Sequence, residues 1–401
     1  PLVGVSTDFG LKDWAFALSV YGPSANAQSN FDSDGRQRFM LVGTDVLLAL
    51  YTASVAYRPL DNLSFGISFH WLNLIQAKLS MAVNGYWDQM NGWQGTDYNE
   101  VEGYEVRADV NVADDFAWAM TLGAWYRPID CLELGFAFRL PTVTFNAEGE
   151  TSLNFYGSTM AALYQSGQDS GGTQGLVAYD KNGNPTSKLP TTMTFSYPMV
   201  GRFGVRYVQW KNGVPEKKGV ASEGDEELFD VEFDLVWEGW SALTDYNLQL
   251  DGYIKLAGAQ NAQEIQFQPV IIPRQYKDTW SFRLGGHYHP LSFLDLQGGV
   301  YYETGAVPGR YTNIDFAGFD RIGVGLGTTF KYDRYSLSVA YSHIFQSTID
   351  VSLDQTEVYK QFPLQKTPPQ DVSAEAEPLK VGAGRFETSY DIVSVALKAH
   401  F

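Results

Sequence analysis

The sequence predicts an all-β protein, a transmembrane antiparallel β-barrel of about 13 strands, and three observations lead to this fold class. Apolar and polar residues alternate along many segments. These segments run to roughly 10 to 20 residues, whereas strands in soluble proteins average about 5 or 6. The connections are alternately short and long, as in outer-membrane barrels, which have short periplasmic turns and long extracellular loops.

The composition excludes several classes of protein. Of the 401 residues, 28 are basic and 46 are acidic, so the net charge of −18 makes a phosphate backbone an unfavourable partner and no nucleic acid is expected. The single cysteine, Cys131, excludes an internal disulfide and a cysteine-built metal site. No apolar run approaches the roughly 18 residues that a membrane helix needs. A membrane location would therefore require a barrel.

The alternation is clearest between Leu228 and Trp240. One face carries Phe229, Val231, Phe233, Leu235 and Trp237, and the other carries Asp230, Glu232, Asp234 and Glu238. Successive side chains of a strand point to opposite faces, so this segment has an apolar and a charged face. The charged face suits a wet or plugged lumen better than a dry core. Similar alternation runs through residues 51–57, 63–71, 104–112, 116–126, 132–140, 279–288, 294–302, 322–330 and 335–351.

The connections define the two ends of the predicted barrel. Short ones, expected in the periplasm, lie near residues 10–13, 59–62, 128–131, 290–293 and 333–334, with a longer exception at 211–226. Long ones, expected outside the cell, cover about 22–45, 84–103, 147–190, 257–264, 308–320 and 353–385. Residues 1–401 are thus expected to form one barrel domain, in which 84–103 and 147–190 cap the extracellular side.

A repeated sequence marks three of the short turns. Residues 57–63, 126–132 and 288–294 each begin with Tyr, carry Pro at the third position and end with Leu. Proline lacks the backbone donor that a ladder needs, so the repeat fits the point where a strand ends. A ring of these tyrosines would form the inner of two aromatic girdles, at the interface between the membrane and the periplasm. Ordinary hairpin chemistry is the alternative reading.

The chain end carries the most specific local signal. Val393, Val395, Leu397, Ala399 and Phe401 alternate up to a terminal aromatic residue. This resembles the C-terminal signal by which bacterial outer-membrane barrels are recognised. Phe401 is therefore expected to engage the barrel-insertion machinery, and the protein is expected to be integral to the bacterial outer membrane, in contact with its lipid.

The strand count is odd. Single-chain bacterial barrels normally have an even number of strands, so one more strand upstream of Pro1 is expected, about 14 in all. A second chain or an unusual odd barrel are the alternatives.

Four segments, in this order, resemble the FadL/TodX-type outer-membrane transport proteins for long-chain fatty acids and other hydrophobic compounds. They are residues 21–27, residues 140–145, Leu189-Pro190 leading into residues 201–207, and residues 233–241. The resemblance implies a 14-stranded barrel plugged by an N-terminal hatch. The hatch and the first strand have no counterpart in this sequence. It also implies passive uptake, in which extracellular loops capture an amphiphile, pass it to the lumen and release it sideways through the wall.

The resemblance places the capture site on two loops. The first contributes Trp87, Met90 and Trp93, and the second contributes Phe155, Tyr156, Met160, Leu163 and Tyr164. The spacing of the apolar residues in the second loop predicts a short amphipathic helix. Exposed apolar loops are costly unless they bind something or pack together, so mutual capping of the two loops is the alternative.

Alternation directs five arginines into the lumen. Arg139, Arg202, Arg206 and Arg283 are candidate contacts for a fatty acid headgroup, and the same count turns Arg107, Glu105 and Asp109 inward. A headgroup would need an arginine that a carboxylate does not already compensate. Ion-pair ladders that stiffen the barrel are the alternative for each of them.

No enzyme, metal or cofactor is expected. His287 and His289 share a strand face, but a third metal ligand is not evident. Ser338 and Ser342 point away from His343, which argues against a Ser–His nucleophile, and no phosphate-binding glycine loop stands out. Two other functions stay open, a water-filled general porin and a structural barrel whose loops bind a protein partner.

Overall fold

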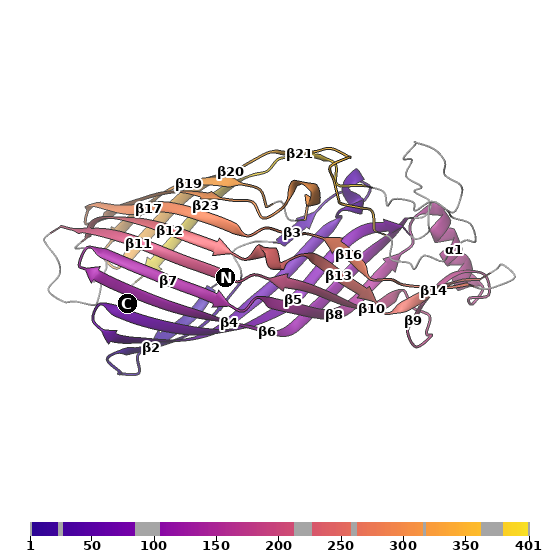
Figure 1. Ribbon diagram of the computed structural model, residues 1–401, viewed down its shortest axis with the longest axis horizontal. Helices are drawn as coiled ribbons and strands as arrows, with labels where there is room; N and C mark the ends of the chain where they lie inside the picture. The colour runs from indigo at the N-terminus through magenta and orange to yellow at the C-terminus, as the bar shows by residue number, and fades with distance from the viewer. Residues whose placement is uncertain are drawn as a thin grey trace.

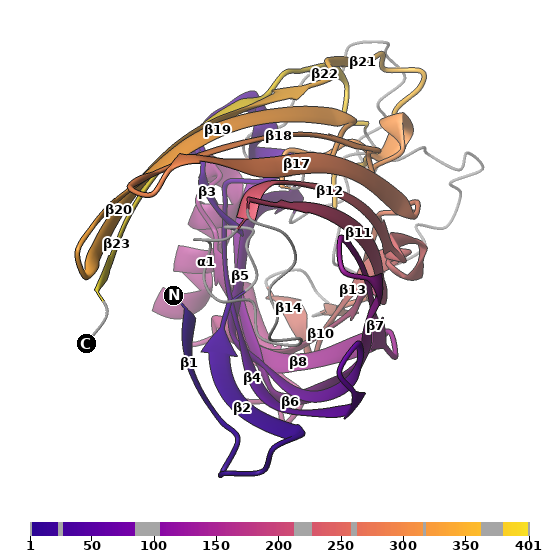
Figure 2. The same cartoon turned by 90° about the vertical axis from the view of Figure 1, so that its left-hand side faces the viewer.

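The structure, a computed structural model, describes residues 2–22, 27–84, 105–211, 227–257, 263–315, 318–361 and 380–399. These residues form mainly antiparallel strands that curl into a barrel (Figures 1 and 2). Within these ranges, no helix is long and apolar enough to cross a membrane.

The wall is one antiparallel sheet. Its undivided strands are β1 (Leu2–Thr7), β2 (Trp14–Tyr21), β4 (Gly43–Leu60), β5 (Leu63–Asn84), β6 (Glu105–Ile129), β18 (Leu294–Glu303), β19 (Arg321–Tyr332), β20 (Tyr335–Gln346) and β23 (Ser389–Ala399). Four wall strands are divided in two: β7 (Leu132–Leu140) with β8 (Val143–Asn154), β11 (Val200–Trp210) with β10 (Lys188–Tyr197), β12 (Glu227–Glu238) with β13 (Asp245–Leu250), and β17 (Thr279–Leu291) with β16 (Val270–Pro273).

The predicted strand number is confirmed. The main sheet has 18 strands; four of these are second halves of divided wall strands, and β3 (Ala27–Asn30) is a short strand beside β4, which leaves thirteen. At the ends of the sheet, β1 pairs with β2 and β23 pairs with β20 among the described residues. The strand expected upstream of Pro1 stays a prediction.

A belt of exposed apolar side chains surrounds the end of the barrel that carries the short turns. Tyr126 and Tyr288 lie near the turns, and Trp118 and Trp280 lie eight positions away on the same strands; all four are exposed. This spacing matches the roughly 9 to 11 residues with which a strand crosses a bilayer. Tyr57 is exposed too, so the three repeat tyrosines lie on the outer surface of the barrel. An aromatic girdle near the short turns requires this position. We call this part of the barrel the membrane half.

Beyond the tryptophans the wall continues toward the long loops. In this part the inner face of the wall is apolar and the outer face is polar. On β5 the register shifts between Leu72 and Ala77, and beyond the shift Leu79 and Met81 are buried in the interior. On β6 Ala119 is buried below the shift, whereas Val110 is buried above it. Beyond each bulge, inward-pointing residues change from even to odd numbers on β5 and from odd to even on β6; this is the parity of the strand. We call this part the extracellular half, because the sequence analysis expects its long loops to lie outside the cell.

The bulges correct one part of the sequence-based assignment. Arg107 and Asp109 were expected in the lumen, but Ala108 between them is buried in the interior cluster. Arg107 and Asp109 therefore lie on the outer face, where they form an ion pair of 3.2 Å. Alternation within residues 104–112 does not reveal the extra residue of β6 between Asp114 and Ala117, and that is why the prediction was wrong.

The interior of the extracellular half is apolar. Leu72, Phe145 and Leu189 are almost completely buried there, and they belong to one continuous cluster. Its other large members include Leu41, Leu50, Leu74, Leu79, Met81, Met160, Leu248, Leu250, Ile254, Val270 and Ile272. At about 25 cal/mol per Å² of buried apolar surface, this cluster supplies much of the stability of the extracellular half.

The four divided strands are interrupted side by side. The widest interruption lies between β10/β11 and β12/β13, where Thr194 pairs with Asn247 and pairing resumes only between Val200 and Glu238. Residues 195–199 and 239–246 are thus outside the ladder, and we call these two stretches the ladder break. The short 3-10 helix η4 (Trp240–Ala242) lies within it.

Three elements of the long connections, α1, β9 and β14, lie at one end of the barrel (Figure 1). The second predicted capping loop contains α1 (Ser158–Asp169), which confirms the predicted helix, and β9 (Gly175–Asp180). β9 joins β14 (Gly252–Ala257) and β15 (Gln263–Gln266) in a three-stranded sheet. β8 and β10 extend into the range expected to be loop. The remaining elements are η1 (Arg36–Phe39), η5 (Gly309–Tyr311), and the pair β21 (Ile349–Val351) and β22 (Gly384–Phe386).

Candidate functional site

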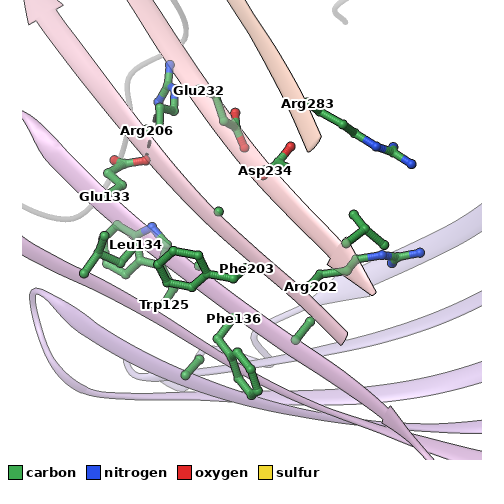
Figure 3. A pocket seen from close by; sticks show the side chains of 15 residues that line it. Trp125, Glu133, Leu134, Phe136, Arg202, Phe203, Arg206, Glu232, Asp234 and Arg283 are labelled. Carbon is green, nitrogen blue, oxygen red and sulfur yellow. Dashed lines mark hydrogen bonds and ion pairs between the residues drawn. The ribbon is translucent and has the colours of Figure 1, made fainter. Parts of the chain in front are cut away.

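The lumen of the membrane half is polar and contains open space. A cavity of about 400 Å³ lies against β6, β7, β11 and β12, and a second of about 450 Å³ lies against β12 and β17 to β20. Glycines on the inner face, among them Gly204 and Gly325, leave room for both. Figure 3 shows the first cavity, with the charged groups of Arg202, Arg283 and Asp234 around it.

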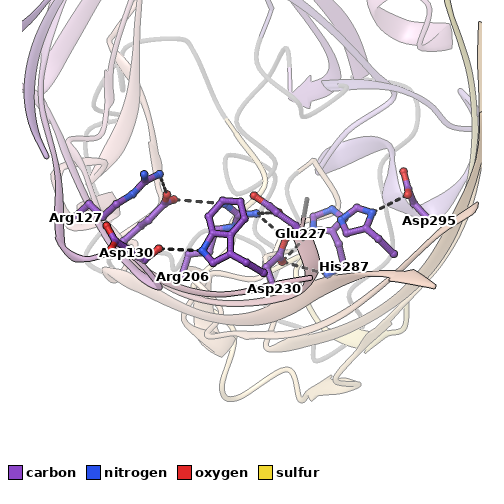
Figure 4. A network of polar contacts seen from close by, with 10 residues as sticks. Arg127, Asp130, Arg206, Glu227, Asp230, His287 and Asp295 are labelled. Carbon is purple, nitrogen blue, oxygen red and sulfur yellow. Dashed lines mark hydrogen bonds and ion pairs between the residues drawn. The ribbon is translucent and has the colours of Figure 1, made fainter. Parts of the chain in front are cut away.

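Near the short turns the lumen carries a network of charges (Figure 4). Arg206 on β11 donates to Glu227 at 2.7 Å and to Asp230 at 2.8 Å. It also pairs with Glu133, which accepts a short hydrogen bond from Arg127. Because both β12 carboxylates are buried, the Arg206 guanidinium neutralises charges that water reaches poorly. Of the four candidate arginines, Arg206 is the one that fits the ion-pair ladder.

The network continues through the two histidines. Asp230 accepts from His287 Nδ1 at 3.1 Å, and Asp295 accepts from His289 Nδ1 at 2.7 Å. Ligand atoms of Glu227, Asp230 and His289 lie within 4.8 Å of one another, so the structure brings two carboxylates to His289 that sequence spacing did not reveal. Arg206 already provides a cation to both carboxylates. The arrangement is therefore an ion-pair cluster around Arg206.

The other three candidate arginines lie near the boundary with the extracellular half. Arg202 has no hydrogen bond or ion pair within the described ranges, and it is exposed in the lumen. Arg139 donates to the Pro198 carbonyl at 3.1 Å and lies over the ring of Tyr197 at 4.5 Å, with no carboxylate partner in the described part of the chain. Arg283 bonds Ser281 and lies 3.9 Å from Glu303.

These three arginines therefore offer positive charge that carboxylates do not fully compensate. In Figure 3 the side chains of Arg202 and Arg283 extend toward the same side of the view, away from Glu232. An arginine presents a planar fork that matches a carboxylate or a phosphate. The group therefore presents donors and positive charge that suit an anionic group.

Aromatic rings line the ladder break just above these arginines. Trp240 makes edge contacts with Tyr197 at 6.4 Å and with Tyr276 at 6.2 Å. Phe195 and Tyr246 pack against the interior cluster on one side and against the small cluster of Leu243, Tyr276, Ala306 and Val307 on the other. The rings thus connect the apolar interior to the break in the wall.

A buried ion pair lies beside the aromatic rings of the ladder break. Arg274, which follows β16, lies over the ring of Tyr246 at 4.3 Å and forms a two-pronged ion pair with Asp315. Burial disfavours the charged guanidinium, but the adjacent carboxylate keeps the pKa of Arg274 above its ordinary value. Asp315 lies in the connection between β18 and β19, so the pair ties that connection to the wall.

Residues of the second capping loop face the interior. Met160 and Phe155 are buried, and Phe155 stacks on Tyr164 at 4.6 Å. Leu163 packs against the interior cluster, whereas Tyr156 is 39% exposed and donates to Glu105. These residues cover one end of the apolar interior. Both capture of a ligand by the loops and mutual capping of the loops require such an arrangement. Trp87, Met90, Trp93 and Phe401 lie outside the described residues.

Sequence reasoning missed Tyr197, Tyr246, Arg274 and Trp240. None of them alternates within a long strand, because each lies at or beside the ladder break. Pro198 and Gly239 could have served as a signal, since proline removes a ladder donor and glycine weakens a strand.

Comparisons with known proteins agree with this architecture. The family described as "Outer membrane protein transport protein (OMPP1/FadL/TodX)" matches residues 219–380. No curated protein sequence matches the chain.

Among solved structures, a Pseudomonas aeruginosa FadL homologue is 18% identical with a TM-score of 0.68, and the match covers 99% of this chain and 77% of that one. The toluene transporter TodX of P. putida is 14% identical with a TM-score of 0.56, covering 100% and 82%. The Ralstonia pickettii toluene transporter TbuX is also 14% identical, with a TM-score of 0.52, covering 100% and 81%.

At these identities the structural likeness establishes the barrel fold. The matched family consists of outer-membrane transport proteins and not of enzymes. The resemblance to the FadL/TodX family that the sequence predicts is therefore confirmed, by the family match over residues 219–380 and by the fold over nearly the whole chain.

Proposed function

We propose that this protein is a passive channel, integral to the bacterial outer membrane, that takes up long-chain fatty acids or similar hydrophobic molecules. The extracellular loops capture the ligand, the apolar interior holds its tail, and the arginines at the lower boundary receive its head. Release is lateral, into the bilayer.

One observation carries this proposal. The extracellular half has a continuous apolar interior, and Arg139 and Arg202, at its lower boundary, have no carboxylate partner among the described residues. An apolar interior holds an alkyl chain favourably because its transfer out of water gains about 0.8 kcal/mol per buried CH₂ group. A guanidinium adds a charge-assisted hydrogen bond to a carboxylate, worth about 1.5–3 kcal/mol.

Lateral release has a physical reason. A ligand that crosses the whole membrane half must displace water from the charges of Arg206, Asp230 and Glu227 without replacing their hydrogen bonds. A ligand that moves sideways enters lipid, where its tail costs nothing to bury.

Binding of oleate to the detergent-purified protein tests the function. We expect native mass spectrometry to retain oleate on the protein, and we expect oleate uptake by cells to depend on it. Arg202→Gln should weaken oleate binding while binding of a neutral alkane of equal length is unchanged. No retained oleate and no protein-dependent uptake would contradict the proposal.

A general porin is the second candidate, and the charged side chains beside the two cavities of the membrane half favour it. A porin conducts ions steadily through a planar bilayer. Sealed behaviour under conditions in which oleate uptake proceeds would exclude it.

A further inference from the structure

We propose that Glu227, Asp230 and His289 bind one divalent transition-metal ion, of the class that includes Zn²⁺, at the end of the lumen that carries the short turns. The site lies apart from the apolar interior and from the arginines at its boundary. It therefore goes beyond the proposed uptake and does not depend on it.

An irregularity of β12 brings its two carboxylates to one face. Where the pairing with β11 passes from Phe229 to Glu227, β12 carries one extra residue, Leu228. A bulge of this kind turns the residue beyond it to the opposite face, so Glu227 points inward beside Asp230 although the two are three positions apart. Regular alternation would place Glu227 on the outer face with Phe229, and for this reason the spacing in the sequence does not reveal a third ligand for the histidines.

His289 on β17 is held in the orientation that a metal ligand needs. Its Nδ1 donates to Asp295 at 2.7 Å, and Asp295 in turn accepts from Lys331 at 3.0 Å. An imidazole with its proton on Nδ1 keeps a lone pair on Nε2. Among the described residues, Nε2 of the buried His289 has no hydrogen bond partner. Histidines that bind metals almost always donate their other ring N–H to a carboxylate, a carbonyl or water, and Asp295 supplies this contact.

The donor set and its spacing suit a transition-metal ion. One ligand atom each of Glu227, Asp230 and His289 lies within 4.8 Å of the other two, and all three residues are buried. Ligands on one tetrahedral Zn²⁺ are about 3.4 Å apart, so small side-chain rotations close the difference. One imidazole nitrogen with two carboxylate oxygens is a familiar set for Zn²⁺, whereas Ca²⁺ takes six to eight oxygens. The second cavity of the lumen reaches Asp230 and His287, which gives an ion access to the site.

The charge of the surrounding network also favours a cation. With neutral histidines, the network contains one more carboxylate than cations within the described ranges. The carboxylates are those of Glu133, Glu227, Asp230 and Asp295, and the cations are those of Arg127, Arg206 and Lys331. A buried charge without a counterion is costly, so the excess carboxylate attracts a further positive charge.

Arg206 competes with the ion for the same oxygens. Its Nη2 donates to Glu227 at 2.7 Å and to Asp230 at 2.8 Å, and an ion between these carboxylates must displace it. Its Nη1 lies 3.5 Å from Glu133, which can retain the guanidinium after displacement. Removal of the guanidinium should therefore tighten metal binding, whereas loss of His289 should weaken it. Unspecific binding does not produce these two opposite effects.

Titration of the purified full chain with Zn²⁺ tests the site. The protein is prepared in detergent without a histidine tag, calorimetry measures the affinity, and elemental analysis after dialysis measures the amount bound. We expect one Zn²⁺ per chain. His289→Gln should weaken binding at least tenfold, and Asp295→Asn, which changes only the residue that orients His289, should weaken it by about 10–100-fold. Arg206→Gln should strengthen it.

His343→Gln is the matched control. His343 Nδ1 also contacts a carboxylate, that of Asp391 at 2.8 Å, but no third ligand group joins this pair in the described part of the chain. We expect His343→Gln to bind Zn²⁺ like the unaltered protein. Folding of each variant is checked by its heat-dependent mobility in gels, and if Arg206→Gln does not fold, the two histidine variants decide.

Three results would overturn the site. The first is that the unaltered protein binds no Zn²⁺, and the second is that folded Arg206→Gln binds it less tightly. The third is that His289→Gln and His343→Gln affect binding equally, which would mean an adventitious ion only. Each of them leaves the proposed uptake untouched, because oleate binding is measured separately.

Discussion

The two halves of the barrel have opposite inner and outer faces. In the membrane half, Phe233 and Leu284 point outward and Arg206 and Asp230 point inward. In the extracellular half, Leu79 is buried inside while Arg107 and Asp109 lie outside. The same wall strands serve both halves, because bulges on β5 and β6 reverse the parity between the two halves. The difference gives one half an apolar outer face, which suits contact with lipid, and the other half an apolar interior.

The largest expected effect comes from a charge in the apolar interior. Leu72→Asp places an unpaired carboxylate where the side chain is 0% exposed, and we expect the extracellular half to lose its packing. Ser68→Asp, on the inner face of the same strand but in the membrane half, is the control, and we expect little change. Proteolysis of the loops at increasing temperature measures both. Equal resistance of the two variants would contradict the contrast between the halves.

Substitutions that create a cavity test the same contrast between the two halves of the barrel. Phe145→Ala in the interior should cost about 3–5 kcal/mol of unfolding free energy, because Phe145 is 1% exposed and packs against Phe195. Phe233→Ala on the lipid-facing belt should cost less, since Phe233 is 41% exposed in the absence of lipid. Denaturant unfolding in detergent compares them. The account fails here if Phe233→Ala proves the more damaging substitution.

Two arginines distinguish a structural from a ligand-binding role. Arg206→Ala leaves Glu227 and Asp230 buried without their partner, and we expect a loss of about 3–5 kcal/mol in stability. Arg202→Ala should change stability by less than about 0.5 kcal/mol but weaken oleate binding by about tenfold or more. Thermal unfolding and oleate titration separate the two effects. A large stability loss for Arg202→Ala would show that it has a structural partner.

The smallest effect is a pH dependence at the extracellular end. Burial alone would raise the pKa of Glu105, but hydrogen bonds from Arg38 and Tyr156 and the charges of Arg38 and Lys360 lower it below its ordinary 4.5. Its ionised form therefore stabilises the fold above that value, and this contribution is lost as the pH falls through the lowered pKa. Glu105→Gln should remove this dependence. Unfolding measured between about pH 6 and about pH 3 tests it, and identical profiles for both proteins would refute it.

Much of the fold could be predicted because a barrel strand is read from alternation. β12, β17 and β20 followed directly, and so did the short turns with their tyrosines. Alternation fails where the chain leaves the ladder. The extra residue that β6 carries between Asp114 and Ala117 reversed the parity of the β6 residues beyond it, and so Arg107 was assigned to the wrong face.

The candidate site was predicted in part. The arginines were found because their parity was right within the membrane half, but the sequence did not distinguish Arg206 from Arg202. That distinction depends on Glu133 and Glu227, which reach Arg206 from neighbouring strands. The ladder break was missed because it depends on tertiary structure. Pro198 and Gly239 lie opposite each other on two strands that are distant in sequence.

The most direct test of the central claim is to locate a bound fatty acid. A long-chain fatty acid with a diazirine at its methyl end is photolysed on the purified protein, and the labelled residues are identified by mass spectrometry. The account predicts labels on interior residues of the extracellular half, such as Leu72, Phe145 and Leu248, and at the ladder break. Labels confined to the polar lumen of the membrane half, beside Arg206 and His287, would contradict it.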